Sequence, residues 1–261
     1  DFQVSLTVES DQPVVAEQRL NFDYMGRGAH SWRGGHCAMG TNPLSGEYYF
    51  AEGTTRSGFE EWVTLQNPNP HDINVQAAYQ LGQGQGGQVE RTYTIPADSR
   101  YTVFVEDEVG RDKDVSVRLT SADDFLAERP MYFDYSYNDL GVQGGHCVIG
   151  ATRTASEWLL AEGYTGGGFN QWLCLQNPSN SDSGVEVAYY TQEAGALPAR
   201  VVTVPAGTRM TLMVNQHAGP DYQLSTRVRV TSGPDIVVER PMYFDYGSGW
   251  PGGPDGVGYT P

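Results

Sequence analysis

Four glutamates occur at equivalent places of repeated motifs, and paired carboxylates are the groups that hydrolyse glycosidic bonds. Glu52 and Glu162 each stand between alanine and glycine, and Glu128 and Glu239 each precede Arg-Pro. A glycosidase needs a pair of carboxylates, one on each side of the bond that is cleaved. Each motif here supplies one carboxylate per repeat. Because catalytic sites are rarely copied unchanged into neighbouring domains, we predict that these glutamates are structural and that the chain is not an enzyme.

Two Gly-Gly-His-Cys motifs place histidine beside cysteine, at His36-Cys37 and at His146-Cys147. Neighbouring residues of a strand point to opposite faces of the sheet, so the two side chains of one motif cannot easily share a metal ion. The spacing also does not match that of a zinc site. We therefore predict structural histidines and no metal site.

Two further patterns match ligand sites only formally. Gly82, Gly84 and Gly87 fit a dinucleotide motif, but a predicted strand follows them where that motif needs a helix, and we predict no bound cofactor. An acidic loop has the oxygen ligands that calcium takes, yet the loop at 215–223 in the second copy keeps only Asp221. A solvated loop is favoured over a calcium site for these residues: Glu106, Asp107, Glu108, Asp112 and Asp114.

The three cysteines, Cys37, Cys147 and Cys174, are candidates for disulfides. An odd number leaves one thiol over, which in a secreted protein favours a bridge between chains; three buried free thiols are the other possibility. Two pairings stay open. Cys147 could bond Cys174 within one domain and leave Cys37 free. Alternatively, Cys174 faces the strand that holds Asp255, and a neighbouring chain replaces that strand with one carrying Cys37.

Aromatic side chains could form a contact surface or a platform for sugars. Trp62 and Trp172 are equivalent in the repeat, which favours core positions. Trp32 and Trp250 lie in variable Gly-rich loops, and we predict that these two contribute to a contact surface.

An internal repeat of about 110 residues must position all of these side chains. The octapeptide that starts at Glu128 recurs at Glu239, an offset of 239 − 128 = 111, and a weaker copy starts at Glu17. The last copy is degraded, because Gly252-Gly253-Pro254-Asp255 stands where the others have Gly-Gly-His-Cys. The chain thus alternates between three short blocks, 1–41, 112–151 and 222–261, and two long blocks, 42–111 and 152–221.

Apolar residues alternate with polar ones through both kinds of block, as in Val115, Val117 and Leu119. This period of two, interrupted by Gly and Pro turns, predicts half-buried strands. The predicted fold is all-β, with tandem Ig-like antiparallel β-sandwich domains; a small barrel is the alternative.

One short block is left over, whichever way the domains are divided. If a long block precedes its short block, the domains are 42–151 and 152–261, and residues 1–41 are a partial repeat of surplus strands. In the opposite order, the domains are 1–111 and 112–221, and 222–261 is surplus. Unpaired strands are edges that a protein must cover or use, so we predict head-to-tail self-association through them.

The motifs Tyr49-Phe50-Ala51-Glu52-Gly53, Leu65-Gln66-Asn67-Pro68, Glu128 to Phe133 and Gly144-Gly145-His146 occur in this order. This pattern resembles uncharacterised repeat domains of secreted and surface proteins from actinobacteria and related bacteria, over nearly the whole chain. The resemblance implies an extracellular repeat that is usually strung in arrays, favours the long-then-short order, and transfers no active site.

The composition of the chain excludes some classes of binding partner. The 261 residues include 16 basic and 32 acidic side chains, a net charge of −16, so nucleic acid is not expected to bind. No apolar run is long enough to span a membrane. We expect an extracellular or cell-surface structural protein that forms a filament or surface assembly. The alternatives are a module that binds glycan or cell-wall polymer, and an accessory region of a larger secreted enzyme.

Overall fold

The structure is a computed structural model that describes residues 3–27, 31–247 and 249–261. It is almost entirely β, with antiparallel pairing between all of its named strands. The predicted all-β class, built as sandwiches of antiparallel sheets, is confirmed. Within the described residues no helix is long and apolar enough to cross a membrane.

The N-terminal short block contributes a hairpin that forms a sheet of its own. Residues 3–16 belong to no strand, and β1 (Glu17–Met25) then pairs with β2 (Ser31–Met39) in register from Glu17 opposite Met39. We call this pair the surplus hairpin. Exposed and less exposed residues alternate along most of both strands, which shows that only one face of this hairpin is covered.

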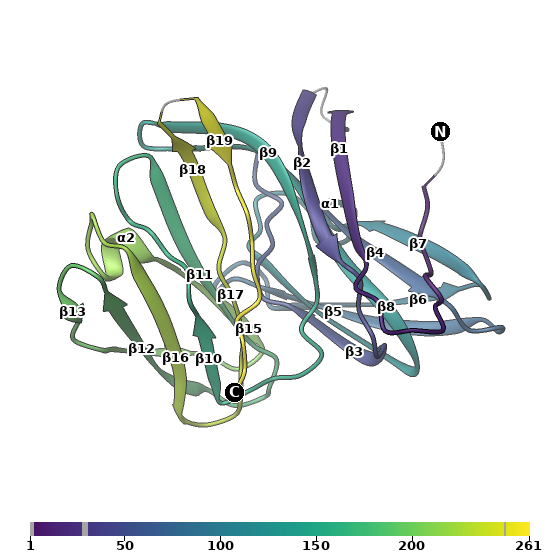
Figure 1. Cartoon of the computed structure of the whole chain (residues 1–261). Helices are drawn as coiled ribbons and strands as arrows, with labels where there is room; N and C mark the ends of the chain where they lie inside the picture. The colour runs from purple at the N-terminus through teal and green to yellow at the C-terminus, as the bar shows by residue number, and fades with distance from the viewer. Residues whose placement is uncertain (1–2, 28–30, 248) are drawn as a thin grey trace.

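Residues 42–151, here called the first module, form one sandwich whose two sheets share a strand (Figure 1). The long strand β8 pairs with β5 and β3 in one sheet and with β4 and β9 in the other. The elements are β3 (Ser45–Phe50), β4 (Phe59–Asn67), β5 (Ile73–Leu81), β6 (Gln88–Ile95), β7 (Ser99–Phe104), α1 (Val105–Val109), β8 (Val115–Tyr137) and β9 (Leu140–Ile149).

Residues 152–261, the second module, repeat this plan with two separate sheets, in the orders β10-β16-β12-β13 and β15-β11-β18-β19. Its elements are β10 (Glu157–Leu160), β11 (Phe169–Asn177), β12 (Ser183–Thr191), β13 (Gly195–Ala196), β14 (Arg200–Val204), β15 (Thr208–Met213), α2 (Val214–His217), β16 (Leu224–Ser232), β17 (Val237–Glu239), β18 (Met242–Tyr246) and β19 (Trp250–Gly252).

The equivalent of β8 is broken at two points in the second module. Gly233, at a φ of +84°, and Pro234 separate β16 from β17, and Pro cannot donate a ladder hydrogen bond. Pro241 separates β17 from β18, although the equivalent Pro130 lies within β8.

Each module has its own apolar core. One cluster of buried side chains runs from Tyr48 to Val148, and a second consists mainly of residues between Trp158 and Val238. These side chains come from the alternating positions of the strands, as the period of two requires. The boundaries 42–151 and 152–261 nonetheless stay a prediction, as does the Ig-like strand order.

Three hairpins lie side by side across the molecule, one from each short block (Figure 1). The surplus hairpin packs on the β8–β9 hairpin, which packs on the β18–β19 hairpin. A third cluster of buried aromatic and apolar side chains joins the last two, and its buried members are Phe133, Tyr135, Val142 and Tyr243.

Candidate functional site: contacts between hairpins and modules

The same aromatic contact occurs twice between successive hairpins. The Phe22 and Tyr132 rings lie edge to face with centroids 5.0 Å apart and planes at 84°. The Phe133 and Tyr243 rings lie 5.0 Å apart at 85°. Phe133 follows Phe22 by 111 residues and Tyr243 follows Tyr132 by 111, so the two contacts are copies that run in the same direction. Each edge-to-face pair stabilises the fold by roughly 0.5–1.5 kcal/mol beyond the contribution from burying the two rings.

Glycines make room for these phenylalanines. A Cβ on Gly145 would lie 2.9 Å from Phe22 Cζ, and a Cβ on Gly253 would clash with Phe133 Cζ in the same way. The second glycine of each Gly-Gly pair therefore receives the phenylalanine of the preceding hairpin. Gly35 is the equivalent glycine of the surplus hairpin, and it is exposed.

No further hairpin covers the matching aromatic face of the last hairpin among the described residues. Phe244 is half-buried against Phe169, with ring centroids 4.8 Å apart. Tyr246 is 65% exposed and its cross-strand neighbour Trp250 is 74% exposed. The row of hairpins thus ends in an open aromatic face on one side and an open Gly35 face on the other.

A buried ion cluster lies where the second module meets the first, and Arg129 is its centre. The guanidinium is fully buried and lies 2.7 Å from Glu52 Oε2, 2.6 Å from Asp255 Oδ2 and 3.2 Å from Glu239 Oε2. Glu239 also accepts hydrogen bonds from the backbone N–H groups of Ala51 (3.1 Å) and Glu52 (2.9 Å). The carboxylates of the two modules therefore share one cation.

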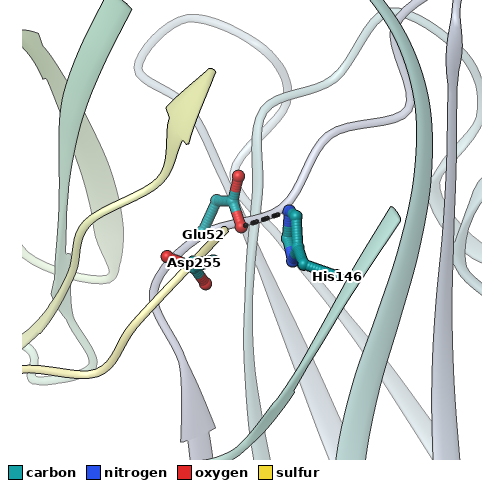
Figure 2. A group of neighbouring side chains, drawn as sticks. All are labelled: Glu52, His146 and Asp255. Carbon is teal, nitrogen blue, oxygen red and sulfur yellow. Dashed lines mark ion pairs between the residues drawn. The ribbon is translucent and has the colours of Figure 1, made fainter. Parts of the chain in front are cut away.

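His146 is the fifth member of the cluster. Its Nε2 lies 3.6 Å from Glu52 Oε2, and Asp255 lies beside both (Figure 2). Burial lowers the pKa of His146 to about 3, so the imidazole is neutral.

Glu52, His146 and Asp255 could hold a metal ion, since their ligand atoms lie within 4.8 Å of one another. However, Arg129 Nη2 already contacts both carboxylates. A divalent ion in the same place would lie next to the guanidinium, and repulsion between two cations in a buried site is strong. Arg129 is therefore the cation that this group is built to hold.

The buried carboxyls differ in their charge. Burial raises the pKa of Glu52 and raises that of Glu239 to about 8, against the opposing pull of Arg129. Burial would also raise the pKa of Asp255, but Arg129 and His146 hold it below its usual range. Near neutral pH, Asp255 is the ionised partner of Arg129.

A further buried carboxyl, Glu61, gives a prediction. Burial raises its pKa to about 8, so the folded chain holds a proton that the unfolded chain releases above about pH 4.5. Stability contributed by this group is therefore lost as pH rises from about 4.5 to 8. The second module has Gln171 at the equivalent position, where Oε1 accepts a hydrogen bond from the N–H of Tyr164.

We expect Glu61→Gln to raise the free energy of unfolding at pH 8 by about 1–3 kcal/mol and to have a much smaller effect at pH 5. Urea denaturation at the two pH values measures the difference. An effect of equal size at both pH values would show that the carboxyl does not take up a proton on folding.

The second module has an incomplete version of the cluster. Arg240 Nη1 donates to the carbonyl of Glu162 at 2.7 Å and lies 3.3 Å from its carboxylate. The Glu162 side chain is 71% exposed, whereas that of Glu52 is 6% exposed. No glutamate equivalent to Glu239 reaches Arg240 in the described part of the chain, where its carboxylate partner is Glu162.

The glutamates of the sequence motifs thus have different surroundings. Glu52 and Glu239 come together on Arg129, from different modules. Glu162 faces outward, and Glu128 contacts Cys147, with Oε2 and Sγ 3.8 Å apart. Sequence reasoning missed Arg129 and treated Asp255 as a sign of degradation. The recurrence of Glu-Arg-Pro was the available signal, since an arginine repeated beside acidic motifs needs partners.

The acidic loop does not converge on one point. Each of four carboxylates pairs with a different arginine: Asp107 with Arg27, Glu106 with Arg111, Glu108 with Arg91, and Asp114 with Arg56. These pairs are partly exposed and each is worth about 0–1 kcal/mol. The glycine motif at 82–87 is the loop between β5 and β6, as the strand predicted after it requires.

One predicted contact residue is wrong. Trp32 is 1% exposed, because its ring stacks on Tyr24 at 5.8 Å and on Tyr132 at 6.4 Å. It anchors the surplus hairpin to β8. The predicted core residues Trp62 and Trp172 are only half-buried. The Trp62 ring packs on Phe104 of β7, and the Trp172 ring packs on Tyr137 at the end of β8.

All three cysteines are free thiols in the structure, and they differ in access. Cys37 is exposed on the open face of the surplus hairpin, and Cys147 is half-buried. Cys174 is 2% exposed between the modules, where its Sγ accepts a hydrogen bond from Arg209 Nη2 at 3.0 Å. The strand position facing Cys174 is already filled by Glu239 of the same chain.

We expect any disulfide between folded molecules to join two Cys37 residues. Cys37→Ser should abolish bridged dimers, while Cys174→Ser should leave them unchanged, because only the first thiol is accessible. Non-reducing electrophoresis after mild oxidation compares the two variants. Dimers that persist in Cys37→Ser would contradict this arrangement.

Comparison with known proteins gives distant likenesses only. No family model and no curated protein matches the chain. Among solved structures it is similar to Thermotoga maritima 1070, with 14% identity and a TM-score of 0.37 over 42% of this chain and 97% of the other. It is also similar to the Anabaena sensory rhodopsin transducer, with 22% identity and a TM-score of 0.29 over 34% and 88%. A third is the CBM22-1-CBM22-2 tandem domain of Paenibacillus barcinonensis Xyn10C, with 7% identity and a TM-score of 0.20 over 85% and 90%. Likenesses at these TM-scores carry no information on function.

Proposed function

We propose that this chain is an extracellular structural protein, a unit of a filament or surface assembly that joins end to end. The observation that supports this is the repeated hairpin contact. Phe22 packs on Tyr132 and Gly145 in the same geometry in which Phe133 packs on Tyr243 and Gly253. A contact repeated in one direction leaves two different open faces, and such heterologous contacts form open filaments when the rotation between units does not close a ring.

In the proposed joint, the β18–β19 hairpin of one molecule packs on the surplus hairpin of the next. Phe244 would meet Gly35, and Arg240 would meet Glu17, which is equivalent to Glu239 in the repeat. The edge-on ring is missing, however, because Asn21 stands where the other hairpins have tyrosine. The joint between molecules is therefore weaker than the contact within the chain, and assembly should depend on concentration.

Sedimentation velocity of the native chain over a range of concentrations, with and without reductant, tests this proposal. We expect a series of oligomers that Tyr246→Asp suppresses, since that side chain is 65% exposed on the open face. Tyr259→Asp is the matched control, at 68% exposure outside the hairpins. Monomers at every concentration, or equal loss in both variants, would overturn the end-to-end joint.

The exposed pair of Tyr246 and Trp250 also favours a second candidate, binding of a glycan or cell-wall polymer. Aromatic rings at 65% and 74% exposure, opposite one another on two strands, form a surface on which a sugar ring can pack. This role predicts retention on polysaccharide that Trp250→Ala removes. Retention by a chain that remains monomeric would favour glycan binding over assembly.

A further inference from the structure

The N-terminal segment is an unpaired copy of a strand that both modules bury. Residues 4–17 match residues 115–128 at a constant offset of 111 with no gap, so Val4, Leu6 and Val8 correspond to Val115, Val117 and Leu119. In the first module this strand is the first part of β8 and lies between β5 and β3. In the second module it is β16, which lies between β12 and β10.

The N-terminal copy differs from its equivalent in β8 in how far its apolar side chains are buried. Val115, Val117 and Leu119 have no exposed surface, because their side chains enter the core of the first module. Val4, Leu6 and Val8 are 62%, 64% and 63% exposed. Apolar side chains at alternate positions are typical of the inner face of a strand, and in the N-terminal copy these side chains have no core to enter.

The described chain has no free place for this strand. Each long block supplies one sheet that needs a central strand, and β8 and β16 already fill those two places. The chain therefore contains three strands of this type and two acceptors.

The segment nevertheless lies where such a strand belongs relative to the next module. Gln3 Oε1 accepts hydrogen bonds from Arg100 Nη1 at 2.8 Å and from the Thr102 hydroxyl at 3.0 Å. The equivalent of Arg100 is Arg209, which donates to the carbonyl of Val115 at the start of β8. Equivalent arginines therefore contact the start of this segment and the start of β8.

We propose that residues 3–8 are a donor strand, and that their partner is a long block of the 42–111 type whose sheet lacks its central strand. The donor enters between the strands equivalent to β5 and β3, with Val4, Leu6 and Val8 directed into that block's core. This inference goes beyond the proposed end-to-end joint, which uses the surplus hairpin, because it names a separate partner for residues 3–8.

The test uses the full chain and a separate polypeptide of residues 42–111 as the acceptor probe. The probe is diluted from denaturant into the native chain, and complexes are measured by size exclusion with light scattering and by hydrogen exchange. We expect a one-to-one complex in which the amides of residues 4–8 exchange at least about tenfold more slowly than in the chain alone.

Two variants of the chain show whether the strand enters as proposed. Leu6→Asp should abolish the complex without changing the stability of the chain alone, because a charge would enter the acceptor's core. Thr7→Arg should still bind, because its equivalent in β8 is Arg118, which is partly exposed. Equal binding by wild type and Leu6→Asp, or no complex with wild type, overturns the proposal.

A joined chain keeps the test decisive if the free probe precipitates. In this longer chain, a second copy of residues 42–111 is joined to Asp1. Its last residue is therefore followed by Asp1, as Arg111 of the native chain is followed by Asp112. Residues 4–8 should become protected there, and unchanged exchange overturns the proposal. Sedimentation of the native chain alone reports on the end-to-end joint separately, so either idea can fail while the other stands.

Discussion

Arg129→Leu is expected to lower the free energy of unfolding by about 3–5 kcal/mol at pH 8, because it leaves buried carboxyls without their shared cation. Asp255 is held ionised chiefly by Arg129, and Glu52 and Glu239 lie against the same guanidinium. Without it, Asp255 must take up a proton or remain charged in a buried site. Both alternatives cost free energy in the folded chain and none in the unfolded chain.

The pH dependence of this loss in unfolding free energy shows whether the buried carboxyls cause it. At pH 5 the carboxyls with raised pKa values are protonated in the folded chain, and the unfolded chain, where their pKa is about 4.5, holds part of these protons as well. The loss in Arg129→Leu should therefore be smaller at pH 5 than at pH 8. Arg118→Leu is the control, since its pair with Glu47 is about one-third exposed and is worth about 0–1 kcal/mol. Urea unfolding curves at both pH values compare the variants; a loss that is independent of pH would point to packing alone.

Phe133→Ala is expected to cost about 3–5 kcal/mol, the range for truncating a fully buried phenylalanine. The ring has no exposed surface and contacts Tyr243, Gly253 and His146. Its loss leaves a cavity at the place where the β8–β9 hairpin meets the second module. Calorimetry should show a lower transition temperature for the whole chain.

The equivalent change in the surplus hairpin separates local from global effects. Phe22→Ala removes the same ring from the same contact, but the hairpin belongs to neither core cluster. We expect the main transition to shift by less than about 1 kcal/mol, while the amides of β1 and β2 exchange faster. A Phe22→Ala loss as large as that of Phe133→Ala would show that the hairpin is integral to the first module's stability.

The fold could be predicted because its cause is local. Alternation in strands such as β5 and β8, together with a repeat of constant offset, predicts paired strands and buried faces without knowledge of tertiary contacts. The same constant offset marks residues 4–17 as a copy of a buried strand. The loss of strand pairing in the N-terminal copy depends instead on a missing neighbour, which no local pattern reports.

The ion cluster could not be predicted because its members are far apart in the chain. Arg129 and Asp255 are 126 residues apart, and Asp255 has no equivalent carboxylate in the other copies. The burial of Trp32 was missed for a related reason. Its Gly-rich surroundings are typical of an exposed loop, but Tyr24 and Tyr132, from two other strands, cover the ring.

The unbroken strand β8 has a mechanical consequence. It runs for 23 residues from one sheet of the first module into the other and is hydrogen-bonded on both sides over much of its length. Tension applied to the β8–β9 hairpin would load these ladders in shear, so many hydrogen bonds must yield together. In the second module the breaks at Gly233-Pro234 and Pro241 divide the same path into β16, β17 and β18. Under a pulling force, the second module should therefore give way first and in smaller steps.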